Sequence, residues 1–284
     1  MDSTWSRKAK DTTAGFCGGA VQVLVGQPFD LVKVRMQTGQ FNSISSAIIQ
    51  TFKNEGISGF YKGTTAPLLG IGFCVSLQFY AFHETKRLFQ RLNNSEKLTL
   101  PQYYVSGAAA GLSNVLIVTP VEHLRIILQT QKTHQFSSPY DAAKTITRNF
   151  GFSKLFRGLT ITTLREIQSY GVWFLTFEYL ISTETRNGRN RGDIPTWKLM
   201  LYGALSGEAL WLSCYPLDVI KSKLQGDHLG PNSRYRGIWS VVKDTYRSSG
   251  VRGFFVGLTP TLIRALPASA CTFATVEWTL RALG

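Results

Sequence analysis

Residues 27–37 read QPFDLVKVRMQ, and the same arrangement returns as TPVEHLRIILQ at 119–129 and as YPLDVIKSKLQ at 215–225. Each copy has a proline, an acid two residues later, a base five residues later and a glutamine nine residues later. The prolines are 92 and 96 residues apart. A pattern that recurs at a near-constant interval indicates an internal repeat. We therefore expect three repeats, at 1–97, 98–193 and 194–284.

The composition predicts an anionic partner and no metal site. The 284 residues include 31 Lys and Arg against 17 Asp and Glu, a formal net charge of +14. Such a balance suits nucleic acid, phospholipid headgroups or acidic metabolites. The four cysteines form no Cys-x-x-Cys pair and have no histidine cluster nearby, so we expect no metal site. The opening MDSTWSRKAKD lacks the apolar core of a signal peptide, so we expect any targeting signal to be internal.

Long stretches with little charge predict membrane helices, because a helix that crosses a bilayer needs about 20 mostly apolar residues. Six such stretches occur, at 12–29, 63–83 and 98–121, and at about 158–180, 198–217 and 257–280. The last three are interrupted near the middle by Arg165 and Glu166, by Glu208, and by Arg264. We predict an all-α membrane protein with six helices, two in each repeat. The alternative, a soluble helical bundle, would need more polar faces than these stretches offer.

Glycine pairs strengthen the prediction of membrane helices. Three Gly-x-x-x-Gly pairs each end nine residues before the proline of their repeat, at 15 and 19, 107 and 111, and 203 and 207. Small residues four apart share one face of a helix and allow two membrane helices to approach closely. We expect the proline that follows to break the helix, because proline lacks an N–H and clashes with the preceding turn.

The acid and base of each copy lie three residues apart, so they share one face of a helix. An exposed local ion pair, worth about 0.5 kcal/mol, would explain one copy but not three. Around a threefold bundle, the acid of one repeat can pair with the base of the next. We predict that six residues form a ring that gates one mouth of a central cavity: Asp30, Lys33, Glu122, Arg125, Asp218 and Lys221. We expect the glutamines one turn beyond each base to bond to this ring: Gln37, Gln129 and Gln225.

A second shared element follows each of these motifs. The segments NEGISGFYKG (54–63), NFGFSKLFRG (149–158) and SSGVRGFFVG (248–257) each place two glycines seven residues apart. An amphipathic stretch precedes each segment, with Ile44, Ile48 and Phe52 in the first repeat. We expect short helices that lie in the membrane interface with their apolar faces toward the lipid. Core packing in a soluble fold is the alternative.

Over nearly its full length the sequence resembles the mitochondrial carrier family, through the tripled Pro-x-acid-x-x-base motif and the paired glycines. The resemblance implies a pseudo-threefold bundle of six helices in the mitochondrial inner membrane, both termini on the outer side, working as a monomer without a cofactor. It also implies a matrix gate formed by the ring and transport by alternating access. Cardiolipin would bind at the repeated glycines, where helix N-termini meet phosphates: Gly56, Gly63, Gly151, Gly158, Gly250 and Gly257.

The sequence departs from the family pattern in three places. Ile127 stands where the second base of the motif is usual, and Val256 stands where the other repeats have Lys62 and Arg157. The family's outer gate pairs acids with bases on the even-numbered helices. The corresponding positions here hold His83, Lys86, Glu178 and Glu277, with Ile181 and Leu280 where two further bases are usual. We therefore expect a weak outer gate. A protonated His83 could pair with Glu178 or Glu277.

Ionisable residues deep in a membrane are candidates for function because burying them there is costly. Arg165 and Glu166 lie seven and eight residues after Gly158, and Arg264 lies seven after Gly257, so all three are expected at one depth. In the family this is the substrate level, and an Arg-acid pair there resembles the amino-acid and carnitine carriers. Glu166 would hold an ammonium group and an arginine would hold a carboxylate. A purely internal Arg165–Glu166 pair is the alternative.

The second helix supplies two further substrate candidates, Gly70 and Cys74. Carriers of basic amino acids resemble one another in having an acid at the position of Cys74, so the cysteine favours a zwitterion such as glutamate or a neutral amino acid. APLLGIG (66–72) resembles the carnitine carriers instead, and a basic amino acid stays possible if Glu208 faces the cavity. Taken whole, the sequence resembles fungal carriers described as transporters of amino acids or organic acids.

Two other functional classes receive little support. A nucleic-acid-binding protein would cluster its bases with exposed aromatic residues, but here the bases lie at helix ends in each repeat. An enzyme would need a catalytic motif, and the sequence has no GxSxG, HExxH or Walker loop. Its four histidines are scattered, at His83, His123, His134 and His228.

Overall fold

The computed structural model describes residues 2–95, 97–131, 135–186 and 191–282 and is all-helical in those residues. Two long helices belong to each repeat. They are α1 (Asp2–Gln37), α3 (Thr65–Asn93), α4 (Leu100–Thr130), α6 (Leu159–Arg186), α7 (Thr196–Gln225) and α9 (Leu258–Ala282). One short helix lies between the two long helices of each repeat. These short helices are α2 (Ile44–Gly59), α5 (Pro139–Phe150) and α8 (Ile238–Ser249). Four short 3-10 helices complete the described chain: η1 (Phe152–Phe156), η2 (Arg191–Asp193), η3 (Gly230–Asn232) and η4 (Val251–Phe255).

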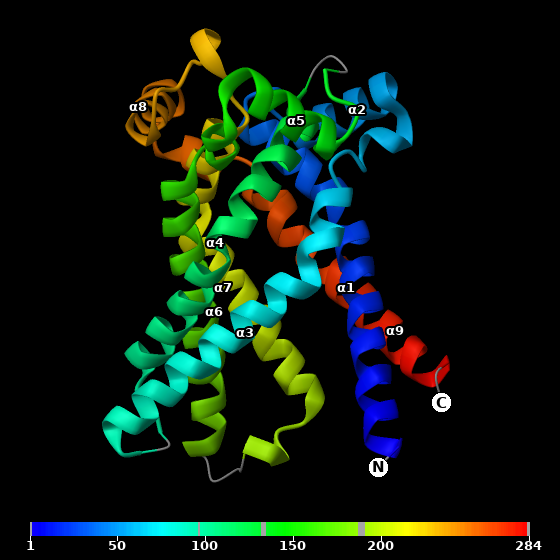
Figure 1. Ribbon diagram of the computed structural model, residues 1–284, viewed down its shortest axis with the longest axis vertical. Helices are drawn as coiled ribbons and strands as arrows, with labels where there is room; N and C mark the ends of the chain where they lie inside the picture. Colours follow the sequence, from blue (N-terminus) through cyan, green and yellow to red (C-terminus); the bar gives the residue numbers. More distant parts are fainter. Residues whose placement is uncertain (1, 96, 132–134, 187–190, 283–284) are drawn as a thin grey trace.

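The long helices converge at one end of the molecule and spread apart at the other (Figure 1). The convergent end, which we call the narrow end, contains α2, α5 and α8 (Figure 1). Both chain termini lie at the opposite, wide end. Helix α1 packs along α9, while α3, α4, α6 and α7 pack in chain order.

The long helices run through their prolines, which corrects one expectation. Pro28, Pro120 and Pro216 each lie inside a continuous helix. Proline removes one hydrogen bond from a helix and bends it. Here the residues on both sides of each proline remain helical.

The glycine pairs do not act alike. A Cβ atom at Gly107 would lie 2.4 Å from the Tyr170 carbonyl oxygen, and one at Gly111 equally close to that of Glu166. Only glycine permits α4 to approach α6 this closely. A Cβ atom at Gly203 or Gly207 would meet no described atom within 4 Å. The predicted close contact is therefore found at α4–α6 and not beside α7.

The six repeated glycines all adopt positive φ, from 59° to 90°. This left-handed region favours glycine because it carries no Cβ. Gly158 and Gly257 stand directly before α6 and α9, and Gly151 and Gly250 directly before η1 and η4. A Cβ at Gly257 would also lie 3.3 Å from the Lys33 carbonyl oxygen. These glycines turn the chain from each short helix into the next long one.

The polarity of the bundle is inverted relative to a soluble protein. Leu116 is 66% exposed and Leu212 is 53% exposed, whereas Asp218 is only 4% exposed. Such a surface suits lipid. By length and composition alone, two spans among the described residues are apolar enough to cross a membrane, Leu100–Thr130 and Val251–Thr272. The sequence predicted six membrane helices. Six helices are long enough to cross a membrane, and buried polar residues lower the mean hydropathy of those that lie outside these two spans.

Candidate functional site

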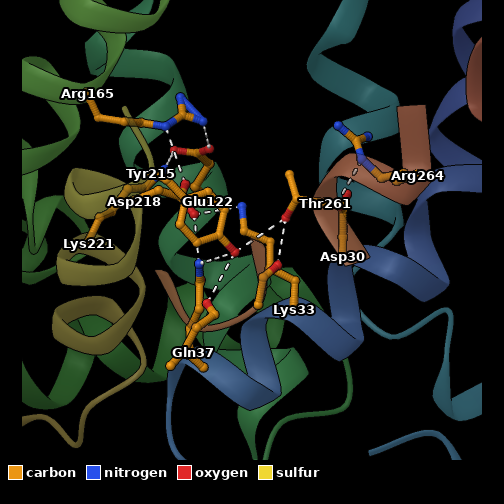
Figure 2. Close-up of polar contacts among 12 residues, drawn as sticks. Asp30, Lys33, Gln37, Glu122, Arg165, Tyr215, Asp218, Lys221, Thr261 and Arg264 are labelled. Carbon is orange, nitrogen blue, oxygen red and sulfur yellow. Dashed lines mark hydrogen bonds and ion pairs between the residues drawn. The ribbon is translucent and has the colours of Figure 1, made fainter. Parts of the chain in front are cut away.

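The six ring residues lie together at the narrow end and pair between repeats. Lys33 Nζ lies 2.6 Å from Asp218 Oδ2, which joins α1 to α7. Arg125 Nη2 lies 2.9 Å from Asp30 Oδ2, which joins α4 to α1. Lys221 pairs with Glu122 and joins α7 to α4. Each acid thus holds the base of a neighbouring repeat, and the three pairs together join α1, α4 and α7 in a ring. Figure 2 labels all of these residues except Arg125.

Only one of the three predicted glutamines bonds to the ring. Gln37 Nε2 donates to Asp218 Oδ2 at 3.1 Å and to the Tyr215 hydroxyl at 3.2 Å. The Gln225 amide instead donates to the Arg157 carbonyl at 3.1 Å. Neither polar atom of the buried Gln129 side chain has a hydrogen-bond partner among the described residues. The prediction was wrong for these two glutamines, because the surroundings of the three positions are not threefold symmetric.

Gln27, which the sequence analysis did not place at the ring, takes the role expected of the other glutamines. Arg125 Nη2 donates to Gln27 Oε1 at 2.6 Å, and Gln27 Nε2 donates to the Lys62 carbonyl at 2.8 Å. The fully buried Gln27 amide therefore holds a ring base from the residue before Pro28. Its place beside a motif proline is the signal that could have found it.

Two further ion-pair clusters tie the narrow end together. Glu55 of α2 lies 2.7 Å from both Arg35 and Lys62. Burial opposes ionisation of Glu55, but these two bases keep its pKa below the ordinary value. In the next repeat, Arg157 lies 2.9 Å from Asp227, beyond the end of α7. The base that precedes the repeated glycine therefore forms its ion pair within repeat 1 in the case of Lys62, but between repeats 2 and 3 in the case of Arg157.

Arg157 and Asp227 form the more extensive of these clusters. The guanidinium of Arg157 also donates to the carbonyls of His228 and Tyr235 and to the Ser233 hydroxyl. Asp227 accepts from the backbone N–H of Tyr235 at 2.9 Å and from the Ser233 hydroxyl at 2.9 Å. The sequence marked Arg157 only as a repeated base and gave no sign of Asp227 as its partner.

The predicted substrate residues Arg165, Glu166 and Arg264 lie beside the ring. Arg165 pairs with the buried Glu166. It also reaches Glu122 and Asp218, each at 3.5 Å. Arg264 Nε lies 3.4 Å from Asp30 Oδ1. The buried Nε atoms of both arginines make no hydrogen bond to a described residue, and they are the atoms that face Asp218 and Asp30 in these ion pairs.

Trp211 on α7 is a further residue of this site that the sequence analysis missed. Its ring lies under three cationic groups: Lys33 Nζ at 4.2 Å, Arg264 Cζ at 5.8 Å and Arg165 Cζ at 5.9 Å. Cations are attracted to the face of an indole within about 6 Å. Tryptophan in a membrane helix prefers the interface, so its place amid a charge-poor stretch is the signal that could have found it.

The remaining substrate candidates are less informative. The Cys74 carbonyl accepts a hydrogen bond from Asn114 at 3.0 Å, and its thiol is free and partly buried. Gly70 belongs to α3 and Glu277 to α9, but their surroundings lie outside the part that the structure describes. Glu208 lies within electrostatic range of Arg264, so this acid is near the site.

The predicted outer-gate residues lie toward the wide end. His83 is exposed and lies beside Phe79 and Phe82, with ring centroids 6.3 Å and 5.5 Å away. Lys86 Nζ lies 5.9 Å from the centre of the Tyr103 ring. Glu178 is buried in α6. The gate role of these residues stays a prediction.

Comparison with known proteins decides the family. A family profile described as "Mitochondrial carrier protein" matches residues 4–93, 96–187 and 192–284, one match for each repeat. The chain belongs to the mitochondrial carrier family. Its pseudo-threefold helical bundle is the carrier fold, and the chain is a mitochondrial membrane protein.

Several relatives are similar over almost the whole carrier chain. A glutamate/glycine mitochondrial carrier of Schizosaccharomyces pombe is 44% identical over 96% of this chain and 94% of its own. A mitochondrial glycine transporter of Saccharomyces cerevisiae is 46% identical over 98% of this chain and 93% of its own. A mitochondrial basic amino acids transporter of Bos taurus is 40% identical over 94% of this chain and 90% of its own.

Proposed function

We propose that this carrier moves a zwitterionic amino acid, glutamate or glycine, across the mitochondrial inner membrane by alternating access. The observation that carries the proposal is the constellation of Arg165, Glu166 and Arg264 beside the ring. An amino acid needs one group for its ammonium and at least one for its carboxylate. Glu166 supplies the first, and either arginine supplies the second through a two-pronged contact.

The charge balance favours glutamate or glycine over a basic amino acid. The site has two arginines, and Cys74 supplies no charge where an acid would hold a second ammonium. The names of the two yeast relatives, a glutamate/glycine carrier and a glycine transporter, support the same substrates.

A basic amino acid is the second candidate, and Glu208 favours it. This acid lies near enough to Arg264 to interact with its charge and could bind a side-chain ammonium or guanidinium. The bovine relative, named as a transporter of basic amino acids, lends this alternative support. Carnitine is the third candidate, from the resemblance of residues 66–72.

In this proposal the ring is the matrix gate and is closed, so the site opens toward the intermembrane space. Cardiolipin is proposed to bind where the repeated glycines precede helix N-termini, because unpaired N–H groups there attract phosphate. The carrier is proposed to act as a monomer, without a cofactor and without catalysing a reaction.

Uptake into liposomes that contain the purified carrier tests this function. The panel is labelled glutamate, glycine, ornithine, arginine and carnitine, each with the same compound inside. We expect glutamate or glycine to enter and ornithine to be excluded. Arg264→Ala should reduce uptake at least about tenfold, because losing a charged hydrogen-bond partner of a ligand costs about 2 kcal/mol. Arg247→Ala, which removes an exposed arginine of α8, is the matched control and should leave uptake unchanged.

The other outcomes are equally informative. Efficient uptake of ornithine or arginine would overturn the argument from Cys74 and make Glu208 the second acid. Uptake of carnitine alone would mean that the resemblance of residues 66–72 to the carnitine carriers identifies the substrate better than Cys74 does. If none of the five compounds enters, this substrate class is wrong.

A further inference from the structure

An ion pair of repeat 1 at the narrow end has apolar residues at both of its positions in repeat 2. Arg35 lies seven residues after the motif proline, Glu55 lies directly before the first repeated glycine, and the two pair at 2.7 Å. The same two positions of repeat 2 hold Ile127 and Phe150. Replacing both partners leaves no unpaired charge behind. It also means that no such ion pair joins α4 to α5 at these positions.

A cavity of about 600 Å³ lies where this ion pair is missing. Ile127 and Phe150 both line it, and Phe136 and Ile146 add further apolar walls. The Gln131 side chain makes two hydrogen bonds of 3.1 Å to the Phe136 backbone, so the fold itself sets this wall. The volume is within the roughly 300–1,000 Å³ that is usual for sites that bind small organic molecules.

Lys223 supplies a positive charge to the same cavity. It is the second base of the motif in repeat 3, but the position of the matching acid in that repeat holds Ser249. Lys223 Nζ donates to the Thr245 hydroxyl at 2.9 Å and forms no ion pair with an acid among the described residues. The cavity therefore combines the apolar positions of repeat 2 with a base of repeat 3 that has lost its acid.

The acids near the cavity already have partners. Asp227 lines the cavity and lies 2.9 Å from Arg157. The charge of Asp244 reaches Lys223, but this acid accepts a hydrogen bond of 2.7 Å from Arg234. The positive charge of Lys223 is therefore available to an anion in the cavity.

The cavity lies beyond the ring, where the ends of three long helices meet. Thr38 just after α1, Thr130 at the end of α4 and Gly226 just after α7 all line it. A Cβ at Gly226 would lie 2.8 Å from Thr38 Cγ2 and 3.3 Å from Ile126 Cγ2, so these chain ends are in close contact. The Gln40 side chain also donates to the Thr130 carbonyl. A molecule in this cavity touches all three repeats, and separating the helix ends would take the cavity apart.

We propose that this cavity is a regulatory site for a small organic anion with an apolar body and one carboxylate. The apolar body packs on Ile127, Phe136 and Phe150, and the carboxylate pairs with Lys223. Such a ligand slows exchange, because a ligand that binds only the closed narrow end shifts the population toward that state.

This inference goes beyond the proposed function. The cavity is separate from the proposed substrate site, because Arg165, Glu166 and Arg264 do not line it. The effect on exchange rests on the proposed gate, whereas the binding itself depends neither on the gate nor on which amino acid is transported.

Binding is measured on the full-length purified carrier, from the rise in unfolding temperature with increasing 3-phenylpropionate. We expect no rise with 3-phenylpropionamide, which has the same body without the charge, or with acetate, which has the charge without the body. Lys223→Gln should weaken the apparent affinity at least about tenfold, because it removes a charged hydrogen-bond partner. Lys243→Gln, which changes an exposed lysine of α8, is the matched control and should bind like wild type.

A double variant removes the apolar part of the site and keeps the net charge. Ile127→Arg with Phe150→Glu places the Arg35–Glu55 ion pair of repeat 1 at the matching positions of repeat 2. The double variant should lose the rise in unfolding temperature with 3-phenylpropionate. In liposomes with the probe on both sides, exchange by the wild-type carrier should slow, and exchange by the double variant should not.

Arg264→Ala separates this site from the proposed substrate site and should keep the rise with 3-phenylpropionate. If wild-type carrier exchanges neither glycine nor glutamate, the proposed function fails. The unfolding measurements contain no amino acid, so they still decide whether the cavity binds the anion.

Four results would overturn the proposal. No rise for the wild-type carrier would mean that the cavity binds no anion of this class. An equal rise with the amide would mean that charge is not recognised. A rise unchanged in Lys223→Gln or in the double variant would mean that the anion binds elsewhere. A rise lost in Arg264→Ala would place the anion in the proposed substrate site.

Discussion

The two ends of this carrier are held by different kinds of contact. At the narrow end, buried and partly buried acids and bases from three repeats pair across helix boundaries, as Lys33 does with Asp218. At the wide end, aromatic contacts take a larger share: Phe82 stacks on Phe174 with ring centroids 3.8 Å apart, Lys86 lies over the Tyr103 ring, and the ion pair of Lys198 with Glu184 joins α7 only to the adjacent α6.

This difference explains why the bundle is closed at one end. Ion pairs between helices are specific, because each needs a partner on another helix at a defined height. An aromatic contact such as the Phe82–Phe174 stack, which links α3 to α6, holds two helices together without drawing the whole bundle shut. The narrow end is therefore the one that the charge pattern closes.

The largest effect should come from removing one ring base. Lys221→Gln leaves Glu122 with only the more distant Arg165, and Lys221 is 2% exposed. Breaking a buried ion pair costs about 3–5 kcal/mol. We expect a clear fall in unfolding temperature and at least about a tenfold fall in exchange rate in liposomes.

The charge-swapped double variant, Glu122→Lys with Lys221→Glu, is the control for this prediction. It keeps one acid and one base at the same two positions, so it should recover part of the lost stability. A Lys221→Gln carrier as stable and active as wild type would show that the charged ring is not what closes the narrow end.

Sequence reasoning could predict the ring because its chemistry is repeated. Three acids and three bases at one spacing specify both which residues pair and which helices they join. The same periodicity misled the placement of Gln129 and Gln225, because their surroundings differ between repeats. In repeat 2 the second base of the motif is Ile127, and Gln225 finds the Arg157 carbonyl instead of the ring.

Features that occur once could not be predicted in this way. Trp211 gathers three cations that come from three different helices, and no spacing in the sequence reports such a meeting. The Arg157–Asp227 pair depends on how the chain turns after α7, because the Ser233 and Tyr235 contacts exist only once that loop is folded.

An intermediate effect should come from this pair, which lies outside the ring at the narrow end. Burial opposes ionisation of Asp227, but hydrogen bonds from the Tyr235 N–H and the Ser233 hydroxyl, with the Arg157 charge, keep its pKa below the ordinary 3.8. An acid whose pKa is lowered by folding stabilises the fold above its unfolded pKa and loses that effect as pH falls through the folded value. Unfolding temperature, measured from pH 7 downward, should therefore decline most steeply below about pH 4.

Asp227→Asn isolates this contribution. The variant should unfold at a lower temperature than wild type at pH 7, and the difference should shrink as the pH falls below about 4. Asp193→Asn, which changes an exposed acid, should match wild type throughout. A constant difference between Asp227→Asn and wild type across the pH range would show that the contact contributes through packing and not through charge.

The smallest effect should come from the wide end, where Lys86→Gln is the counterpart of Lys221→Gln. Lys86 contacts the Tyr103 ring, and an interaction of this kind at a partly exposed site is worth about 0.5–1 kcal/mol. We expect exchange in liposomes to fall by no more than about threefold, because Ile181 and Leu280 leave Lys86 as the one base at the expected outer-gate positions. If Lys86→Gln instead abolished exchange, Lys86 would have to pair with an acid when the wide end closes, and the two ends would alternate between equally strong sets of ion pairs.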